Sequence, residues 1–225
     1  VSLTALVIGS LMPDLEAYVR LSSQKAHSHT WAALLWFCLP VGFLLSLLYH
    51  LLVRNPFINN LPPFLNKKLA PFTSFNWLRH LKKYWPVVIV SFLVGGASHL
   101  LWDSFSHYDG LLQHLNPALT GNTVIWGYNI EIPYLIQYLN SILGLLIITV
   151  AILTLPAKQQ SNIGRKWWYY WMMVLGISAL IFLVRWAAMD SFKIDDIIVS
   201  FSAALLLAIL IVSIWKQLKR KSEAN

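Results

Sequence analysis

Residues 86–107 read PVVIVSFLVGGASHLLWDSFSH, an apolar run long enough for a membrane-spanning helix. On a helix, His99, Asp103 and His107 are spaced four residues apart, so their side chains project from one face. Ionisable groups inside or at the edge of a bilayer are costly and should face protein or a water-filled cavity. Imidazole and carboxylate at this spacing make half of a divalent-metal site. The alternative is a set of hydrogen bonds to neighbouring helices.

The composition of the whole chain is that of an integral membrane protein. Of its 225 residues, 57% are hydrophobic and 12% are charged, whereas roughly 25% of a soluble domain is charged. The length suits one domain, residues 1–225, and the fold class expected is all-α, a polytopic transmembrane helical bundle. Cys38 is the only cysteine, so the chain forms neither an internal disulfide framework nor a cysteine-based zinc site.

The apolar segments predict about five full spans and a partial N-terminal span. The full spans are expected at residues 31–53, 86–107, 134–155, 168–188 and 196–215. Residues 1–12 are apolar, but as a helix they would extend only ~18 Å. Because the chain opens with valine, we expect either that part of this helix lies upstream or that the segment only partly enters the bilayer. No basic region or small-residue cleavage site favours a signal peptide.

The basic residues indicate the orientation of these spans. Thirteen of the seventeen Lys and Arg lie in the loop 54–85, the loop 156–167 and the C-terminal tail, which the expected spans place on one side. The positive-inside rule assigns that side, including the C-terminus, to the cytoplasm, with the chain expected as a multi-pass protein of the cell membrane. Although the net charge of +8 would permit nucleic-acid binding, this distribution favours membrane lipids as partners and no nucleic acid.

Two of the loops have distinct expected structures. Residues 75–85, FNWLRHLKKYW, alternate apolar and basic positions within the cytoplasmic loop 54–85, which predicts an interfacial amphipathic helix on the anionic membrane surface. Residues 108–133 contain no Lys or Arg and are expected to form an extracytoplasmic loop.

Two further segments bring metal-binding residue types to the extracytoplasmic end. Asp14 follows Pro13 after the first apolar segment, and His27 and His29 directly precede the second span. The alternative for Pro13 and Asp14 is a helix terminator or N-cap. Side chains two residues apart do not share a helix face, so at most one of the two histidines is expected to be a ligand. Imidazoles and carboxylates together suit a divalent metal, with zinc as a candidate.

The order of these segments resembles a known family. SLTALVIGSLMPDLE (2–16), HSHT (27–30) and GGASHLLWDSFSHYDG (95–110) resemble a family of uncharacterised bacterial multi-pass membrane proteins, classed as a domain of unknown function. More distantly, the order PD, HS-x-T and H-x3-D is similar to the YdjM-like predicted membrane-bound metal-dependent hydrolases.

The resemblance implies a particular ligand set. Its candidate metal ligands are Asp14, His29, His99 and Asp103, with His27 and His107 as alternates. Members of the family usually begin with a short stretch containing Pro, Thr and a Ser-His pair, so a further histidine ligand is expected upstream of this sequence.

The leading functional hypothesis is a metal-dependent hydrolase whose site faces the extracytoplasmic interface. Asp14 and Asp103 are the candidate catalytic residues, as oxygen ligands or general base, while His29 and His99 are neutral-nitrogen ligands. A site at headgroup depth favours a lipid phosphoester as substrate.

Arg185, inside the expected span 168–188, is a candidate phosphate-binding residue. Its alternatives are a salt bridge to Asp190 and snorkelling to the interface. For the whole protein, the alternatives are a transporter with an acidic outer vestibule and a non-catalytic scaffold whose polar network fixes helix packing.

Overall fold

The computed structural model describes the chain except for residues 24–26, 107–113, 117–120, 158–166, 190–192 and 224–225. The fold is all-α, as expected, and five helices are long and apolar enough to cross a membrane. These candidate spans are Leu34–Asn59, Trp77–Ser104, Ile132–Thr154, Trp167–Ala187 and Ile194–Arg220. The number of spans predicted from hydropathy is therefore confirmed.

The N-terminal segment forms a short helix, α1 (Leu3–Leu11), followed by the 3-10 turn η1 (Met12–Asp14) and the helix α2 (Leu15–Arg20). At nine residues, α1 is too short to cross a bilayer. It packs lengthwise against α6 (Trp77–Ser106), and the backbone of Ser2 donates to the Ser91 hydroxyl at 2.8 Å. The buried core around this pair includes Ile8, Met12 and Phe92.

The candidate span Leu34–Asn59 contains two π-helical turns. It runs through η2 (Leu34–Cys38), α3 (Leu39–Leu48), η3 (Tyr49–Val53) and α4 (Arg54–Asn59). Pro56 has no N–H for the Leu52 carbonyl four residues earlier. The side-chain amide of Gln217, on α10 (Ile194–Ser222), instead donates to the carbonyls of Leu51 and Leu52, each at 2.8 Å. These two bonds hold α10 against the span Leu34–Asn59.

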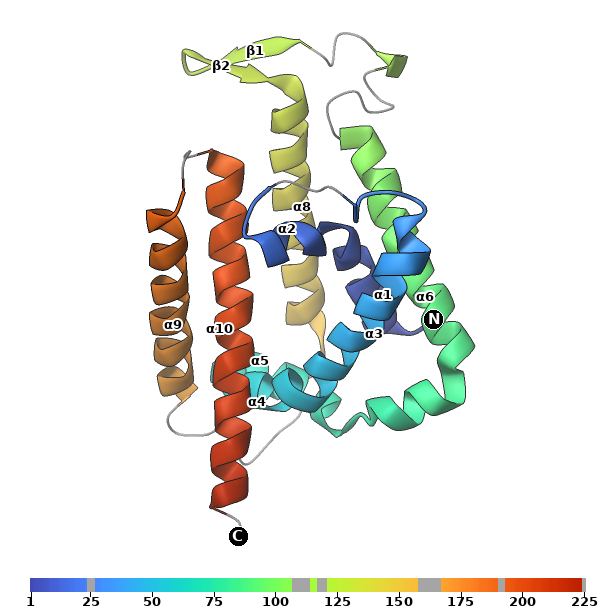
Figure 1. The fold of residues 1–225 in the computed structure, drawn as a ribbon, viewed down its shortest axis with the longest axis vertical. Helices are drawn as coiled ribbons and strands as arrows, with labels where there is room; N and C mark the ends of the chain where they lie inside the picture. The colour runs from blue at the N-terminus through green and yellow to red at the C-terminus, as the bar shows by residue number, and fades with distance from the viewer. Residues whose placement is uncertain (24–26, 107–113, 117–120, 158–166, 190–192, 224–225) are drawn as a thin grey trace.

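Most of the predicted amphipathic segment, residues 75–85, lies in the same helix as the candidate span Trp77–Ser104. After α5 (Pro63–Leu69) and the 3-10 helix η4 (Ala70–Ser74), α6 begins at Trp77 and kinks at Tyr84, whose φ of −124° and ψ of 31° are not helical. Pro86 lies just beyond the kink and removes a backbone hydrogen bond there. Figure 1 shows the first turns of α6 lying across the bundle axis before the helix turns along it. That these turns lie on the membrane surface stays a prediction.

The loop expected at 108–133 contains a hairpin that its composition did not indicate. Strands β1 (Asn122–Ile125) and β2 (Tyr128–Glu131) pair antiparallel around Trp126 and Gly127, whose φ angles are 51° and 82°. Positive φ at both central residues is typical of a two-residue hairpin turn. β2 passes directly into α8 (Ile132–Thr154), and no part of the apolar window of that helix is buried within the chain.

The last two helices form a second packed pair. α9 (Trp167–Ala187) contacts α10 through a buried cluster that includes Tyr170, Val174 and Val212. At one end of the bundle lie α4, α5, the start of α6 and the C-terminal end of α10; the end of α6, the hairpin and the start of α10 lie at the other (Figure 1). The described basic residues of the loop 54–85 and of the tail therefore share one end.

Candidate metal centre

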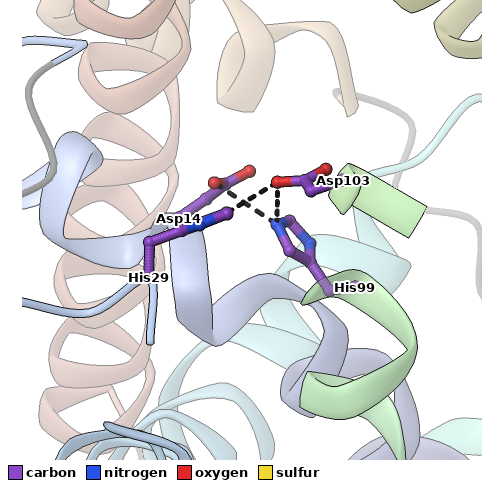
Figure 2. Close-up of side chains that lie close together, drawn as sticks. All are labelled: Asp14, His29, His99 and Asp103. Carbon is purple, nitrogen blue, oxygen red and sulfur yellow. Dashed lines mark hydrogen bonds and ion pairs between the residues drawn. The ribbon is translucent and has the colours of Figure 1, made fainter. Parts of the chain in front are cut away.

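Four side chains from three separate segments meet at one point. Asp14, His29, His99 and Asp103 each offer a ligand atom, and these atoms all lie within 4.8 Å of one another (Figure 2). Nε2 of His29 lies 2.6 Å from Oδ2 of Asp103, and Nε2 of His99 lies 3.2 Å from the same oxygen. Nε2 of His99 is also 3.5 Å from Oδ1 of Asp14. The structure thus brings together the four residues that the sequence singled out as ligands.

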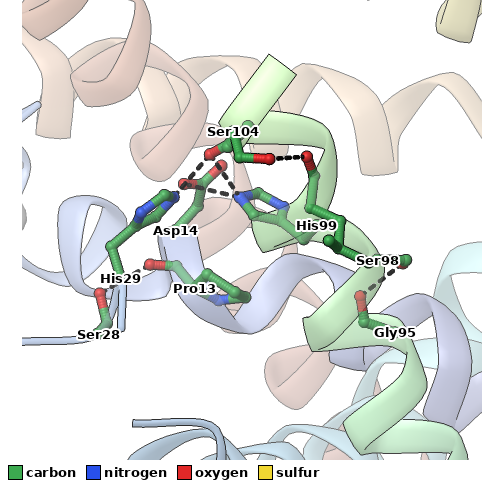
Figure 3. A network of polar contacts seen from close by, with 10 residues as sticks. Pro13, Asp14, Ser28, His29, Gly95, Ser98, His99 and Ser104 are labelled. Carbon is green, nitrogen blue, oxygen red and sulfur yellow. Dashed lines mark hydrogen bonds and ion pairs between the residues drawn. The ribbon is translucent and has the colours of Figure 1, made fainter. Parts of the chain in front are cut away.

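The α6 half of the cluster follows from helix geometry. His99 and Asp103 lie one turn apart on the same face, as their spacing predicts. The two serines beside them are turned back onto the helix: the Ser98 hydroxyl donates to the Gly95 carbonyl at 2.7 Å, and the Ser104 hydroxyl to the Leu101 carbonyl at 2.6 Å (Figure 3). The imidazole and carboxylate are therefore the groups that this face presents to the other segments.

Asp14 reaches α6 because α1 and α6 make backbone contact. A Cβ built on Gly95 would lie 2.2 Å from the Leu6 carbonyl oxygen, and one on Gly9 would lie 2.4 Å from the Phe92 carbonyl oxygen. The glycines before His99 therefore permit close approach of the two helices. The 3-10 turn after α1 then directs Asp14 towards His99 (Figure 2).

The Asp14 carboxylate affects the pKa of a neighbouring tyrosine, Tyr18. Burial, followed by the Asp14 carboxylate, raises the pKa of Tyr18 above its ordinary value. A carboxylate has this effect because it opposes a second negative charge nearby.

His29 is held by bonds to the segment that carries Asp14. The hydroxyl of Ser28, which is fully buried, donates to the Pro13 carbonyl at 2.7 Å (Figure 3). This bond joins the residue before one candidate ligand to the residue before the other. Residues 27–30 have no regular secondary structure, so such tertiary bonds determine where His29 lies.

The cluster has the dimensions and chemistry of a divalent-metal site. With ligand bonds of ~2.0–2.1 Å, neighbouring ligands of a tetrahedral zinc site lie ~3.3 Å apart. The separations of 3.2 and 3.5 Å around His99 fit this value, while the 2.6 Å contact has the length of a hydrogen bond between His29 and Asp103. Two imidazoles and two carboxylates suit zinc and neighbouring divalent ions.

The cluster is open on one side. The side chains of His99 and Asp103 are 16% and 13% exposed, but those of His29 and Asp14 are 27% and 32% exposed. Catalytic zinc sites keep an open coordination position, whereas structural sites are closed by four protein ligands. The exposure gradient places that open side nearest Asp14.

The other predicted site residues that the structure describes, His27 and Arg185, contact other groups. His27 is 67% exposed, and its Nδ1 lies 3.5 Å from Oε1 of Glu16; His107 and Asp190 lie outside the described residues. Nε of Arg185 donates to the Leu21 carbonyl at 3.1 Å, and Nη1 donates to the Ala188 carbonyl at 3.4 Å. The bond to Leu21 links Arg185 to the turn after α2, and phosphate binding by Arg185 stays a prediction.

Another histidine, His50, has contacts of a different kind. His50 is buried, with Nε2 3.1 Å from the Thr4 hydroxyl and Nδ1 2.9 Å from the Arg54 guanidinium. Its ring stacks on Trp77 at 4.7 Å between centroids. The contacts described for His50 include no carboxylate. The surroundings of His50 therefore differ from the site around His99, where two carboxylates could bind a metal.

Comparison with known proteins identifies a family. A family model described as Domain of unknown function (DUF4184) matches residues 1–214, a range that includes all four cluster residues. No curated protein and no solved structure matches the chain.

Proposed function

The chain belongs to the DUF4184 family, whose function is unknown, and from this premise we propose that it is a membrane-embedded, metal-dependent hydrolase. The observation that carries the proposal is the convergence of Asp14, His29, His99 and Asp103 from three segments onto one half-open point. The similarity of the PD, HS-x-T and H-x3-D order to the YdjM-like predicted hydrolases supports the same class of reaction.

The four residues have different roles in this proposal. His29, His99 and Asp103 hold the metal, because Oδ2 of Asp103 lies within 3.2 Å of both imidazole nitrogens. Two histidines and one carboxylate are a known ligand set of catalytic zinc. Asp14, whose Oδ1 lies at a longer 3.5 Å from Nε2 of His99 and whose side chain is the most exposed of the four, is the general base.

The chemistry expected is hydrolysis of a phosphoester. A bound divalent cation would polarise a phosphoryl oxygen and lower the pKa of nearby water to about 7. Asp14 accepts the proton of the attacking water as the new P–O bond forms, and returns it to the alkoxide that leaves as the ester P–O bond breaks. The open side beside Asp14 is the side from which substrate and water enter.

The position of the site favours a lipid substrate. Asp103 lies near the end of α6, and the side chains of Leu101 and Trp102 beside it are exposed on an apolar helix that has the length to cross a bilayer. These side chains would face acyl chains while the site opens at headgroup depth. We therefore propose a lipid phosphoester as substrate class and the extracytoplasmic leaflet as its source.

The division of roles predicts that Asp14→Asn separates metal binding from turnover. The variant should keep close to the parent's metal content, because the three proposed ligands remain. It should lose ~10²–10⁴-fold of the phosphoester hydrolysis, the contribution of a general base. Metal analysis and hydrolysis of lipid phosphoesters by protein in proteoliposomes measure the two effects. An Asp14→Asn variant with full turnover, or a parent that holds no metal, would refute the proposal.

The proposed orientation predicts which ends are accessible from outside the cell. In a Cys38→Ala background, cysteine at Asn122, on the hairpin, should react with an impermeant thiol reagent in intact cells. Cysteine at Ala157, after α8, should react only after permeabilisation. Both residues are exposed in the structure, so burial does not confound the comparison. The reverse labelling pattern would place the metal site in the cytoplasm.

A further inference from the structure

Glu16 is a buried carboxylate beside the candidate metal centre and outside its ligand set. It lies in the first turn of α2 and is 8% exposed. Oε2 accepts the backbone N–H groups of His27 at 2.8 Å and Ser28 at 2.9 Å. Oε1 pairs with Nη2 of Arg20 at 2.9 Å. One carboxylate thus binds the two backbone amides that immediately precede His29.

The ligands of the cluster differ in how their positions are set. His99 and Asp103 keep their relation through the hydrogen bonds of α6. His29 lies in a stretch without regular secondary structure, and its position depends on bonds made by its neighbours. On the side before His29, these bonds include the two amide bonds to Glu16 and the bond from Ser28 to Pro13.

We infer that Glu16 is a positioning residue that determines the affinity of the site through His29. The inference rests on the proposed function, in which His29 is a ligand. Hydrogen bonds to a carboxylate are about twice as strong as those between neutral groups, and a buried carboxylate is strongly destabilised without them. The Glu16 carboxylate and the 27–28 backbone therefore fix each other. Removing the carboxylate would free the backbone before His29. None of the four ligand residues is itself substituted.

The test measures Zn²⁺ affinity of the purified full-length protein in detergent by competition with a chromogenic chelator. Glu16→Ala should weaken Zn²⁺ binding ~10–100-fold, as removal of an outer partner of a ligand does. Glu16→Gln should weaken it less, because the amide oxygen can still accept the two N–H groups. Arg20→Gln and His27→Ala are the matched controls and should each change affinity less than ~5-fold, because they remove exposed partners of Glu16 and leave the two amide bonds.

A double-mutant cycle distinguishes positioning of His29 from a general structural role. If Glu16 acts through His29, adding Glu16→Ala to His29→Ala should lower the Zn²⁺ affinity no further than His29→Ala alone. Effects that multiply would show that Glu16 acts elsewhere and would overturn the inference. If Glu16→Ala does not fold, Glu16→Gln in the same cycle gives the answer. A parent that binds no Zn²⁺ refutes the proposed function itself, whereas a parent that binds and a Glu16→Ala variant of equal affinity refute only the role of Glu16.

Discussion

Replacing Asp103 with asparagine should yield a folded protein that has lost most of its metal. Asp103 Oδ2 contacts both imidazole nitrogens, at 2.6 and 3.2 Å, so it contributes the charge that a cation between them needs. Asparagine keeps the size and much of the hydrogen bonding but removes that charge. We expect Zn²⁺ affinity to fall by more than the ~10–100-fold that loss of an outer hydrogen bond costs. Elemental analysis after size-exclusion chromatography measures the loss.

Asp195→Asn is the matched control for this substitution. It makes the same chemical change at an exposed position in the first turn of α10, and it should leave metal content at the parent's level. His99→Ala should behave like Asp103→Asn, because it removes the imidazole that both carboxylates face. A purely structural polar network predicts a different result, namely metal at background in the parent and in all three variants.

Gly95→Ala should destabilise the protein strongly and also abolish the metal site. The added Cβ would lie 2.2 Å from the Leu6 carbonyl oxygen and 2.8 Å from the Ser10 nitrogen, and backbone atoms cannot move aside as a flexible side chain can. Separating α1 from α6 should cost about 3 kcal/mol, the upper end of the usual cost of overpacking. It should also move Asp14 away from His99. Unfolding by mixed-micelle denaturation, together with Zn²⁺ affinity, measures both effects.

The same substitution on another span provides the control. A Cβ on Gly144, in α8, meets no atom within 4 Å. Because alanine favours a helix over glycine by up to ~1 kcal/mol, Gly144→Ala should leave stability unchanged or slightly raised. Equal stability of the Gly95→Ala and Gly144→Ala variants would show that the α1–α6 contact is looser than the structure indicates.

The sequence indicated those features that depend on local pattern. Runs of apolar residues predicted the five spans, and the four-residue spacing of His99 and Asp103 predicted their shared face. Asp14 and His29 were identified by residue type and family resemblance. Their distance from α6, however, depends on the packing of Gly9 against Phe92 and of Gly95 against Leu6, which no local pattern encodes.

Other features could not be predicted because they depend on tertiary contacts. Glu16 looked like an ordinary charged residue at a helix start, and its role appears only when its bonds to the backbone of His27 and Ser28 are known. Arg185 bonds to Leu21, far away in sequence. The hairpin was missed because Trp126–Gly127 is not one of the common turn pairs, although its glycine was a usable signal.

The direct passage from β2 into α8 makes that helix a lever. Glu131 ends the strand and Ile132 begins the helix, while the Ile132 N–H also donates to the Gly121 carbonyl at 3.0 Å. Lys68 Nζ donates to the carbonyls of Leu153 and Leu155 and so holds the C-terminal end of α8, while the apolar window of the helix is unburied within the chain, so acyl chains would contribute to its tilt. At ~1.5 Å per residue the helix is ~34 Å long. A tilt of about 10° about its C-terminal end therefore moves the end next to the hairpin by roughly 6 Å. The thickness of the bilayer would thus determine where the hairpin stands above the end of α6.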